Sequence, residues 1–237
     1  MSIVSIVIPV YNNSVSIVAV VEGIRNSFKE RINETAMFYL VDDSSNDGTA
    51  QLMNDEFESS EDVKLILLNR NIGQVGAIMA GLSKCEASGP IVITSADGQD
   101  PADAIVSMID AWRRSKPDMV VARKASKREP SESFHRLVSR FYPRYPATGF
   151  DMVVLTGDFA FSLRKKRIRF LQVDMLRNAK SVDYIDYQKL SRSVGRSEWT
   201  LMSKVIYASK FIVFYTPIMK WIGVAITLTL LGLLIFK

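Results

Sequence analysis

The chain has 237 residues, 48% of them hydrophobic, so it is long enough for one large domain or two small ones with a substantial core. Its one cysteine, Cys85, excludes an intrachain disulfide, and its one histidine, His135, argues against a histidine-based zinc site. Residues 1–111 carry 16 acidic and 6 basic side chains, whereas residues 112–237 carry 9 and 24. This basic second half predicts an anionic partner: nucleic acid, a membrane surface or a phosphorylated substrate.

The first half alternates short apolar runs with polar turns and helical patterns. Strands are predicted at residues 3–9, 37–41, 63–68, 90–94 and 119–122, where the runs are apolar and mostly β-branched. Helices are predicted at 14–31, 49–58, 75–84 and 102–112, each after a polar turn. Four such alternations predict an α/β fold with a Rossmann-like, mostly parallel sheet flanked by helices.

The polar turns after these strands carry the candidate functional residues. Because parallel strands end at one edge of a sheet, turns that are distant in sequence converge there, and open α/β sheets bind ligands at that edge. The turn at residues 95–101 (Ser-Ala-Asp-Gly-Gln-Asp-Pro) places Asp97 and Gln99 at a strand end, and such oxygen donors suit Mg²⁺ or Mn²⁺. The alternative is a plain turn in which Asp100 starts a helix and Pro101 takes its first position.

The second half has a different pattern of residues, rich in basic and aromatic side chains. Residues 123–145 interleave seven cations with four aromatic side chains, a pattern that fits nucleic-acid binding, a helix on a membrane surface or a lid over phosphates. Residues 164–169 hold five cations in six positions, which predicts a solvated helix start or contact with an anionic surface. A further strand is predicted at residues 182–187.

The end of the chain predicts a membrane anchor. Residues 221–236 are uncharged and mostly apolar. A helix that starts near Pro217, with the Lys220 side chain reaching back to the membrane interface, is long enough to span a bilayer. The alternative is a buried core helix. Cations at Lys204, Lys210 and Lys220 favour a cytoplasmic N-terminal side. Since a membrane segment accounts for the basic charge, no nucleic-acid partner is expected.

Several of these segments together resemble the family 2 glycosyltransferases of the GT-A fold. Residues 6–12 (Ile-Val-Ile-Pro-Val-Tyr-Asn), 41–49 (Val-Asp-Asp-Ser-Ser-Asn-Asp-Gly-Thr) and 71–74 (Asn-Ile-Gly-Gln) match the family's nucleotide-binding segments. Residues 96–101 are similar to the polyprenyl-phosphate branch, which includes dolichyl-phosphate mannose synthases and bacterial undecaprenyl-phosphate glucosyl- and aminoarabinosyltransferases. Residues 136–142, 157–159 and 192–199 support the same branch.

The chain departs from that branch at several points. Ser95 stands where the branch usually has an aspartate, so one carboxylate on the metal side is missing. Glu198 stands where it usually has a lysine, and Arg196 replaces the adjacent acid, so these two charges are transposed. Many members carry two or more membrane helices, whereas one is expected here.

The resemblance implies a GT-A catalytic domain at residues 1–198, followed by a juxtamembrane amphipathic helix at 199–215 and a transmembrane helix at 216–237. The expected enzyme is a metal-dependent, inverting hexosyltransferase that moves sugar from a nucleotide-diphosphate sugar, expected to be a UDP-sugar, to a polyprenyl phosphate such as undecaprenyl phosphate. Its expected place is the inner (plasma) membrane, with the catalytic domain on the cytoplasmic face and with homo-oligomers forming there. Two alternatives stay open: transfer to a lipid-linked saccharide or polymer, and a non-catalytic nucleotide-sugar-binding partner of a membrane complex.

The implied site residues fall into groups by role. The nucleotide-binding group is Pro9, Tyr11, Asn12, Asp42, Asp43, Ser44, Asn71, Gly73, Gln74, Ala96 and Asp97. The metal ligands are Asp97 and Gln99, and the cofactor is Mg²⁺ or Mn²⁺. The acceptor phosphate-binding group is Arg123, Lys127, Arg136, Ser139 and Arg192. The catalytic group is Asp97, Asp158, Arg136 and Arg192, with Asp158 orienting an arginine or a sugar hydroxyl.

The nature of the acceptor explains why cations matter more than a general base. A phosphate monoester is already largely dianionic near neutral pH, because its second pKa is about 6. Such an acceptor needs no base to remove a proton, but its approach to an anionic donor requires positive charge.

Overall fold

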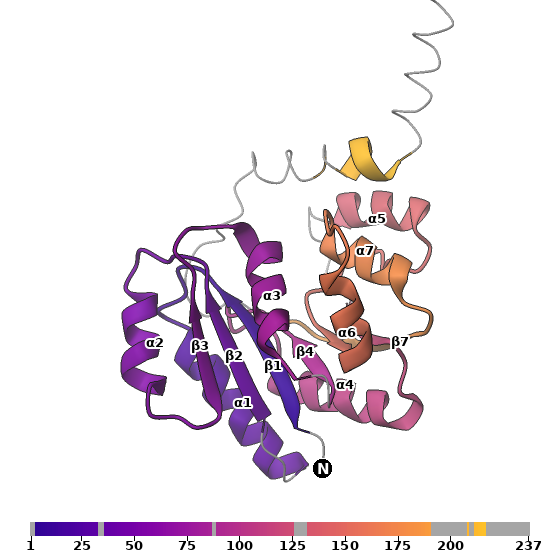
Figure 1. The fold of residues 1–237 in the computed structure, drawn as a ribbon. Helices are drawn as coiled ribbons and strands as arrows, with labels where there is room; N and C mark the ends of the chain where they lie inside the picture. Colours follow the sequence, from indigo (N-terminus) through magenta and orange to yellow (C-terminus); the bar gives the residue numbers. More distant parts are fainter. Residues whose placement is uncertain are drawn as a thin grey trace, which may run out of the picture. The chain divides into compact units, whose positions relative to one another are not determined.

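The computed structural model describes residues 3–32, 36–86, 89–125, 132–190, 208 and 211–216 (Figure 1). The chain divides into two units, Met1–Gly195 and Arg196–Lys237. The labelled elements all belong to the first unit. In chain order they are β1 (Val4–Val10), α1 (Ile17–Arg31), β2 (Ala36–Asp42), α2 (Thr49–Phe57), β3 (Val63–Leu67), α3 (Gly73–Lys84), β4 (Ile91–Ile93), α4 (Ala102–Ser115), β5 (Met119–Lys124), α5 (Glu132–Phe141), β6 (Val153–Leu155), α6 (Gly157–Arg164), α7 (Leu171–Asn178) and β7 (Val182–Tyr187).

The described strands form one seven-stranded sheet in the order β3-β2-β1-β4-β6-β5-β7. All neighbouring pairs are parallel except those of β6, which runs antiparallel to both β4 and β5. In Figure 1, β1 starts beside the N-terminus at the bottom, so the carboxyl ends of the parallel strands face the top. The loop that precedes β6 lies at this same edge, because β6 begins where its neighbours end.

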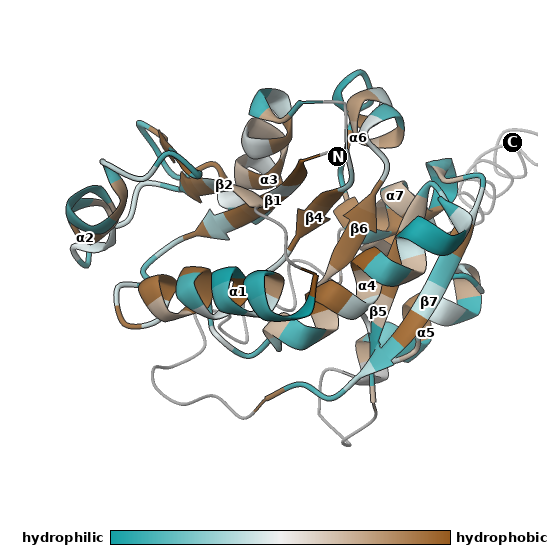
Figure 2. Cartoon of the chain, turned by 90° about the horizontal axis from the view of Figure 1, so that it is seen from below, coloured by the Kyte–Doolittle hydropathy of each residue, from teal (hydrophilic) through white to brown (hydrophobic). Residues whose placement is uncertain are grey.

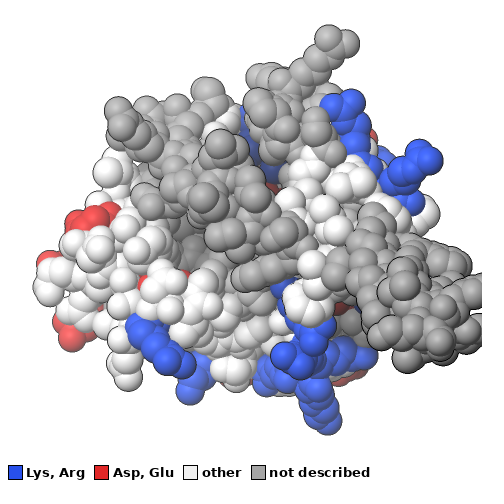
Figure 3. All heavy atoms as spheres, turned by 90° about the horizontal axis from the view of Figure 1, so that it is seen from above, with Lys and Arg blue, Asp and Glu red and all other residues white. Residues whose placement is uncertain are grey.

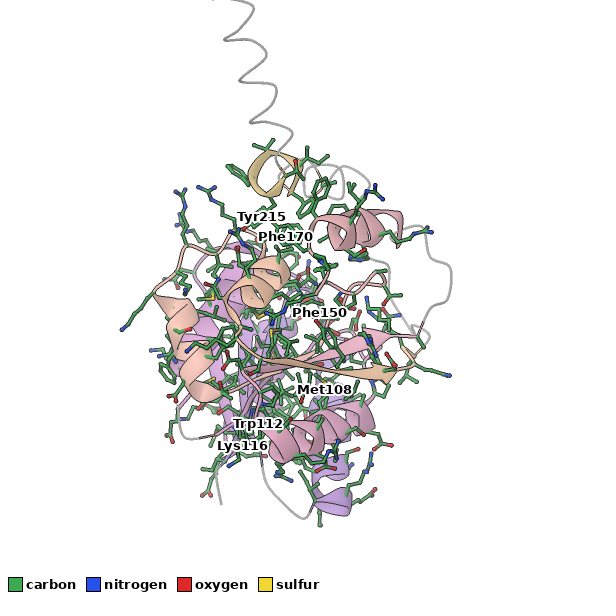
Figure 4. All side chains as sticks on the ribbon, turned by 90° about the vertical axis from the view of Figure 1, so that its right-hand side faces the viewer. Met108, Trp112, Lys116, Phe150, Phe170 and Tyr215 are labelled. Carbon is green, nitrogen blue, oxygen red and sulfur yellow. The ribbon has the colours of Figure 1, made fainter. Side chains whose placement is uncertain are left out.

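Helices cover both faces of the sheet. Helices α1 and α4 pack together on one face, and α3 and α6 pack together on the other (Figures 1 and 2). The apolar strands lie between these layers, as Figure 2 shows, and β4 and β6 are buried along their whole described length. Figure 4 shows Met108 and Trp112 one turn apart on α4, of which Met108 is fully buried. This is the three-layer α/β architecture that the alternating pattern predicted.

The four predicted strand–turn–helix units are confirmed, with boundaries that shift by a few residues. Helices α6 and α7 were not predicted from the sequence, and two further features differ from the sequence-based expectation. Strand β6 was not predicted, because three apolar residues are too short for a periodic pattern to show. The cations of residues 164–169 do not start a helix: α6 ends at Arg164, and they follow its C-terminus, where positive charge complements the helix dipole.

An aromatic group joins the elements near α5 and α7. The rings of Phe134 and Phe170 have centroids 6.0 Å apart, and those of Tyr145 and Phe150 are 5.7 Å apart. His135 Nδ1 lies 2.9 Å from the Tyr145 hydroxyl. Figure 4 labels Phe150 and Phe170 in this part of the first unit. The histidine and these aromatic residues of the basic second half therefore have a packing role.

The second unit is described at residues 208 and 211–216, and residues 211–215 are helical. Most of the predicted juxtamembrane helix and all but the first residue of the predicted transmembrane helix thus lie outside the described residues. Within the described part of the chain, no helix has both the length and the apolar character needed to cross a bilayer. The anchor stays a prediction.

Gly81 allows α3 to pack closely on β1 and β2. A Cβ atom at this position would lie 2.5 Å from Val7 Cγ1 and 3.0 Å from Val41 Cγ2, and both valines are fully buried. We expect Gly81→Ala to lower the free energy of unfolding by about 1–3 kcal/mol, since overpacking outweighs the gain in helix propensity. Gly23→Ala on α1, where nothing lies within 4 Å of the added atom, is the matched control and should stabilise by up to about 1 kcal/mol. Chemical denaturation measures both, and equal effects would contradict this packing.

Candidate active site

The loops after β1 and β2 are joined by hydrogen bonds at the carboxyl edge of the sheet. The Asn12 amide donates to Ser45 Oγ over 2.9 Å, and the Asn46 amide donates back to Asn12 Oδ1 over 3.0 Å. Asn12 has a φ of 53°, in the left-handed region that asparagine tolerates better than most residues. Asp47, which accepts from both Ser14 and Thr49, strengthens the connection. The two loops therefore form one rigid wall.

Asp42 and Asp43 are adjacent buried carboxylates with different surroundings. Asp43 accepts the Ile72 amide at Oδ1 over 2.7 Å and the Gly73 amide at Oδ2 over 2.8 Å, so it fastens the loop before α3. Asp42 accepts the Ser45 amide at Oδ2, but its Oδ1 is buried and has no hydrogen-bond partner among the described residues. A buried acceptor without a partner is costly unless a ligand supplies a donor. Asp42 is therefore the carboxylate that fits a ligand N–H or O–H.

The other predicted nucleotide-binding residues lie in or beside the loops that follow β1, β2, β3 and β4. Gly73 has a φ of 81°, which a glycine adopts without strain, and Asn71 Oδ1 accepts its amide over 3.2 Å. Ala96 is buried and accepts the Ser16 hydroxyl at its carbonyl oxygen. Those at intermediate exposure are Pro9, Tyr11 and Ser44, and Gln74 is exposed.

The turn after β4 is organised around Asp97. Its Oδ1 accepts the Gln99 amide over 3.1 Å and lies 2.8 Å from Ser95 Oγ, which in turn lies 2.7 Å from Asp100 Oδ2. The Asp100 carboxylate turns back into the sheet edge, and Pro101 is the N-cap residue of α4, one position before the first helical residue. The arrangement differs from the plain turn in which Asp100 starts the helix. Burial and the nearby Asp151 raise the pKa of Asp100 above its ordinary value.

A cluster of three charges lies at the same edge, on the β5 and β7 side, and we call it the Lys–Asp–Lys cluster. Asp151, just before β6, accepts Lys124 Nζ over 2.7 Å and Lys189 Nζ over 2.6 Å at a single oxygen, Oδ2. Burial disfavours these charges, but the two ammonium groups hold the pKa of Asp151 down to about 2, and Asp151 raises the pKa of Lys189. The sequence analysis missed this cluster, because its members come from three separate segments and no spacing links them.

The Lys–Asp–Lys cluster predicts a pH dependence of stability. A carboxylate whose pKa is lower in the folded state than its ordinary 3.8 stabilises the fold above that value, and this stabilisation is lost as the pH falls toward about 2. We therefore expect the stability of the wild type relative to Asp151→Asn to fall between about pH 4 and pH 2. Denaturation curves at a series of pH values measure this difference, and parallel pH profiles would exclude it.

The described residues of the predicted acceptor-binding and catalytic groups lie on different elements and have different partners. Arg123 forms a two-bond ion pair with Asp186, with Nε–Oδ1 at 2.9 Å and NH2–Oδ2 at 3.1 Å, and its guanidinium lies 5.3 Å from the centroid of the Tyr184 ring. Arg136 is exposed on α5, and Ser139 Oγ donates to its carbonyl oxygen over 2.9 Å. Asp158 is exposed in the first turn of α6. Lys127 and Arg192 lie outside the described residues.

The donor set indicates how a metal would be held. In the part of the chain that is described, no group of three or more histidine, cysteine, aspartate or glutamate side chains could hold an ion. Asp97, with Gln99 two residues on, offers one carboxylate and one amide oxygen. Mg²⁺ is commonly bound by one or two carboxylates together with substrate phosphates, so these residues fit a metal that is shared with a diphosphate.

Charge is also unevenly distributed over the surface of the first unit. Viewed from the side of the sheet's carboxyl edge in Figure 3, acidic side chains lie at the left, on the side of α2, and most basic side chains lie along the lower and right-hand parts. On this face of the molecule, acidic and basic side chains are therefore largely separated.

The chain belongs to glycosyl transferase family 2, whose model matches residues 5–169. It is 31% identical over 219 residues to the undecaprenyl-phosphate 4-deoxy-4-formamido-L-arabinose transferase of Serratia proteamaculans, a match that covers 85% of this chain and 64% of the relative. The chain thus spans slightly less than two thirds of that relative's length. The family resemblance drawn from the sequence motifs is confirmed.

Solved structures share the fold at low sequence identity. Mannosyl-3-phosphoglycerate synthase from Rubrobacter xylanophilus matches with a TM-score of 0.65 at 14% identity, over 94% of this chain and 75% of that one. Glucosyl-3-phosphoglycerate synthase from Mycobacterium tuberculosis, in complex with Mn²⁺, UDP and glucosyl-3-phosphoglycerate, matches with 0.65 at 11% identity, over 90% and 78%. The likeness identifies the GT-A type of fold.

Proposed function

We propose that the chain is a metal-dependent, inverting glycosyltransferase that moves a sugar from a nucleotide-diphosphate sugar, a UDP-sugar, to a polyprenyl phosphate such as undecaprenyl phosphate. The observation that carries this proposal is the placement of two acidic groups at one edge. Asp42, at the end of β2, has a buried Oδ1 without a partner among the described residues, and Asp97 is oriented in the turn after β4. The similarity to an undecaprenyl-phosphate transferase supports the acceptor class.

The nucleotide occupies the wall formed by the loops after β1, β2 and β3. Asp42 Oδ1 accepts a hydrogen bond from a base N–H or a ribose hydroxyl, which removes the cost of the unpartnered oxygen. Asp43 acts indirectly, because both of its oxygens hold the Ile72 and Gly73 amides that shape the third loop. Asn12, Ser44 and Asn71 complete the wall.

Asp97 and Gln99 would hold Mg²⁺ or Mn²⁺ against the donor diphosphate. When bound, the ion neutralises the negative charge that develops on the leaving diphosphate. Ser95 takes the place of a second carboxylate and instead lies within hydrogen-bond distance of Asp97, so it helps to keep that side chain in one orientation. Glucosyl-3-phosphoglycerate synthase, which shares the fold, was solved with Mn²⁺ and UDP, and this supports a divalent metal as the cofactor.

The chemical step is a single displacement at the anomeric carbon. An oxygen of the acceptor phosphate forms the new bond to that carbon while the bond to the donor diphosphate breaks, so the configuration inverts. The acceptor oxygen carries no proton that must be removed, since the monoester is largely dianionic. The chain therefore positions two anions and offsets their repulsion. Arg136 and Arg192 supply positive charge, and Asp158 orients an arginine or a sugar hydroxyl.

A lipid acceptor requires access to a membrane. The uncharged run at residues 221–236, preceded by Lys204, Lys210 and Lys220, supports an anchor in the inner membrane with the catalytic domain on the cytoplasmic face. Within this proposal the domains are 1–198, 199–215 and 216–237, the enzyme forms homo-oligomers, and no nucleic acid binds.

The test is an incubation of the full chain with labelled nucleotide sugars, Mn²⁺ and undecaprenyl phosphate, followed by extraction into organic solvent. We expect an acid-labile monosaccharide phospholipid whose formation requires undecaprenyl phosphate. Label in lipid-linked oligosaccharides would favour the alternative acceptor. Nucleotide binding without transfer from any donor would favour a non-catalytic binding partner, for which the replacement of a usual aspartate by Ser95 is the supporting feature.

A further inference from the structure

We propose that Lys124 and Lys189 bind the phosphate monoester of the acceptor, on the side of the Asp97 turn that faces away from the nucleotide loops. This inference rests on the proposed function for the identity of the acceptor. The site it assigns, a phosphate-binding pair of lysines held by Asp151, is defined by the sheet and by the contacts of the Lys–Asp–Lys cluster alone.

The strand order separates two sides of the edge. Strands β1, β2 and β3, with the nucleotide loops, lie on one side of β4, and β6, β5 and β7 lie on the other. Lys124 is the last residue of β5, Lys189 follows β7, and Asp151 precedes β6. The Asp97 turn, which follows β4, lies between the two sides. A donor that spans the first side up to Asp97 leaves the second side for another anion.

Hydrogen bonds hold Lys189 close to the Asp97 turn. The amide of the next residue, Leu190, donates to the Gln99 carbonyl oxygen over 2.8 Å, and Gln99 Nε2 donates to the Leu190 carbonyl oxygen over 3.4 Å. The Tyr187 hydroxyl, two residues before Lys189, donates to Asp100 Oδ1 over 3.0 Å. Lys189 is thus fixed from both sides beside the residue proposed to bind the donor diphosphate.

The Lys–Asp–Lys cluster carries an excess positive charge. Two ammonium groups share one carboxylate oxygen, and the lysine side chains are only 19% and 22% exposed. Two further carboxylates, Asp100 and Asp97, act on Lys189 through their charges. Asp100 forms an ion pair with neither lysine in the described structure, and its oxygens are occupied by Ser95 and Tyr187. An ammonium has three donors, and among the described residues Asp151 is the partner of each, so donors remain for phosphate oxygens.

Arg123, the neighbouring cation predicted from sequence, is differently placed. Its two-bond pairing with Asp186 already satisfies its charge. Successive side chains of a strand point to opposite faces, so Arg123 and Lys124 diverge from the end of β5. Lys124 is the one that reaches the edge beside Asp151, which makes it the better candidate for phosphate.

The experiment compares binding of two anions to the full chain in detergent: farnesyl phosphate as a short acceptor, and UDP with Mn²⁺ as a donor nucleotide. Lys189→Gln and Lys124→Gln should each raise the Kd of farnesyl phosphate about tenfold or more, about 1.4 kcal/mol or more, with UDP binding unchanged. Asp151→Asn should lower that Kd, because it removes the anion that competes with phosphate. Lys64→Gln, at an exposed lysine of β3, is the matched control. Kinetics should show a raised acceptor KM for the two lysine variants.

Three results would overturn the inference. Weaker UDP binding with farnesyl phosphate binding unchanged would assign the lysines to the donor. If Lys124→Gln and Lys189→Gln bind both anions as Lys64→Gln does but unfold at a lower temperature, the Lys–Asp–Lys cluster is purely structural. If Arg123→Gln loses farnesyl phosphate binding and neither lysine variant does, the acceptor phosphate is bound by Arg123 instead of the lysines. If Asp151→Asn does not fold, the lysine variants decide. Lysine-dependent binding of farnesyl phosphate without sugar transfer from any donor would refute the proposed function alone.

Discussion

Replacing Asp97 by alanine is expected to weaken Mn²⁺-dependent binding of the donor nucleotide diphosphate about a hundredfold or more and to abolish transfer. Asp97 is the oriented carboxylate in the turn after β4, held by the Gln99 amide. Asp100 in the same turn is already engaged by Ser95 and Tyr187, so it does not compensate for the loss of Asp97. Calorimetry of nucleotide binding with and without the metal measures the effect, and it separates loss of the metal contribution from loss of the nucleotide contacts at Asp42.

The control is Asp55→Ala, at an exposed carboxylate of α2 that is hydrogen-bonded to Gln51. It should leave both nucleotide binding and its metal dependence at the wild-type level. If Asp97→Ala keeps a metal-dependent affinity for the nucleotide, then the metal is held elsewhere and the role given to this turn is wrong.

The second large effect is expected at the arginines of the second half. Arg136→Ala and Arg192→Ala should each lower lipid-product formation about a hundredfold, in line with truncating one partner of a charge pair at a phosphate, while nucleotide affinity and donor hydrolysis by water stay unchanged. The donor diphosphate has a proposed metal to neutralise it, whereas the acceptor phosphate depends on side chains. Parallel assays of donor binding and lipid-product formation check both halves of this expectation.

Arg114→Ala, at an exposed arginine in the last turn of α4, provides the comparison for removal of one positive charge. If Arg136→Ala or Arg192→Ala instead abolishes nucleotide binding and spares the apparent affinity for the acceptor, the assignment of these arginines to the acceptor is reversed.

The pair Asp42 and Asp43 shows where sequence reasoning stops. Asp42 is the last residue of β2 and Asp43 follows it, in a recognisable motif, and both were predicted to bind nucleotide. Their roles separate only when the loop before α3 is placed, because Asp43 is then occupied by the Ile72 and Gly73 amides while Asp42 keeps a buried oxygen without a described partner. The difference depends on which backbone amides come within 3 Å, and no local pattern encodes that.

The sequence by itself determined the four strand–turn–helix units of the first unit and the edge of the sheet to which their polar turns lead. Apolar β-branched runs and helical periodicity are local properties, and parallel strands necessarily bring their polar turns to one edge. Tertiary structure alone decided that β6 enters the sheet antiparallel, that Arg123 pairs with Asp186, and that Lys124, Asp151 and Lys189 meet. These contacts join residues from separate strands, and an ion pair requires charges within a few ångströms, so they exist only once the order of the strands is set.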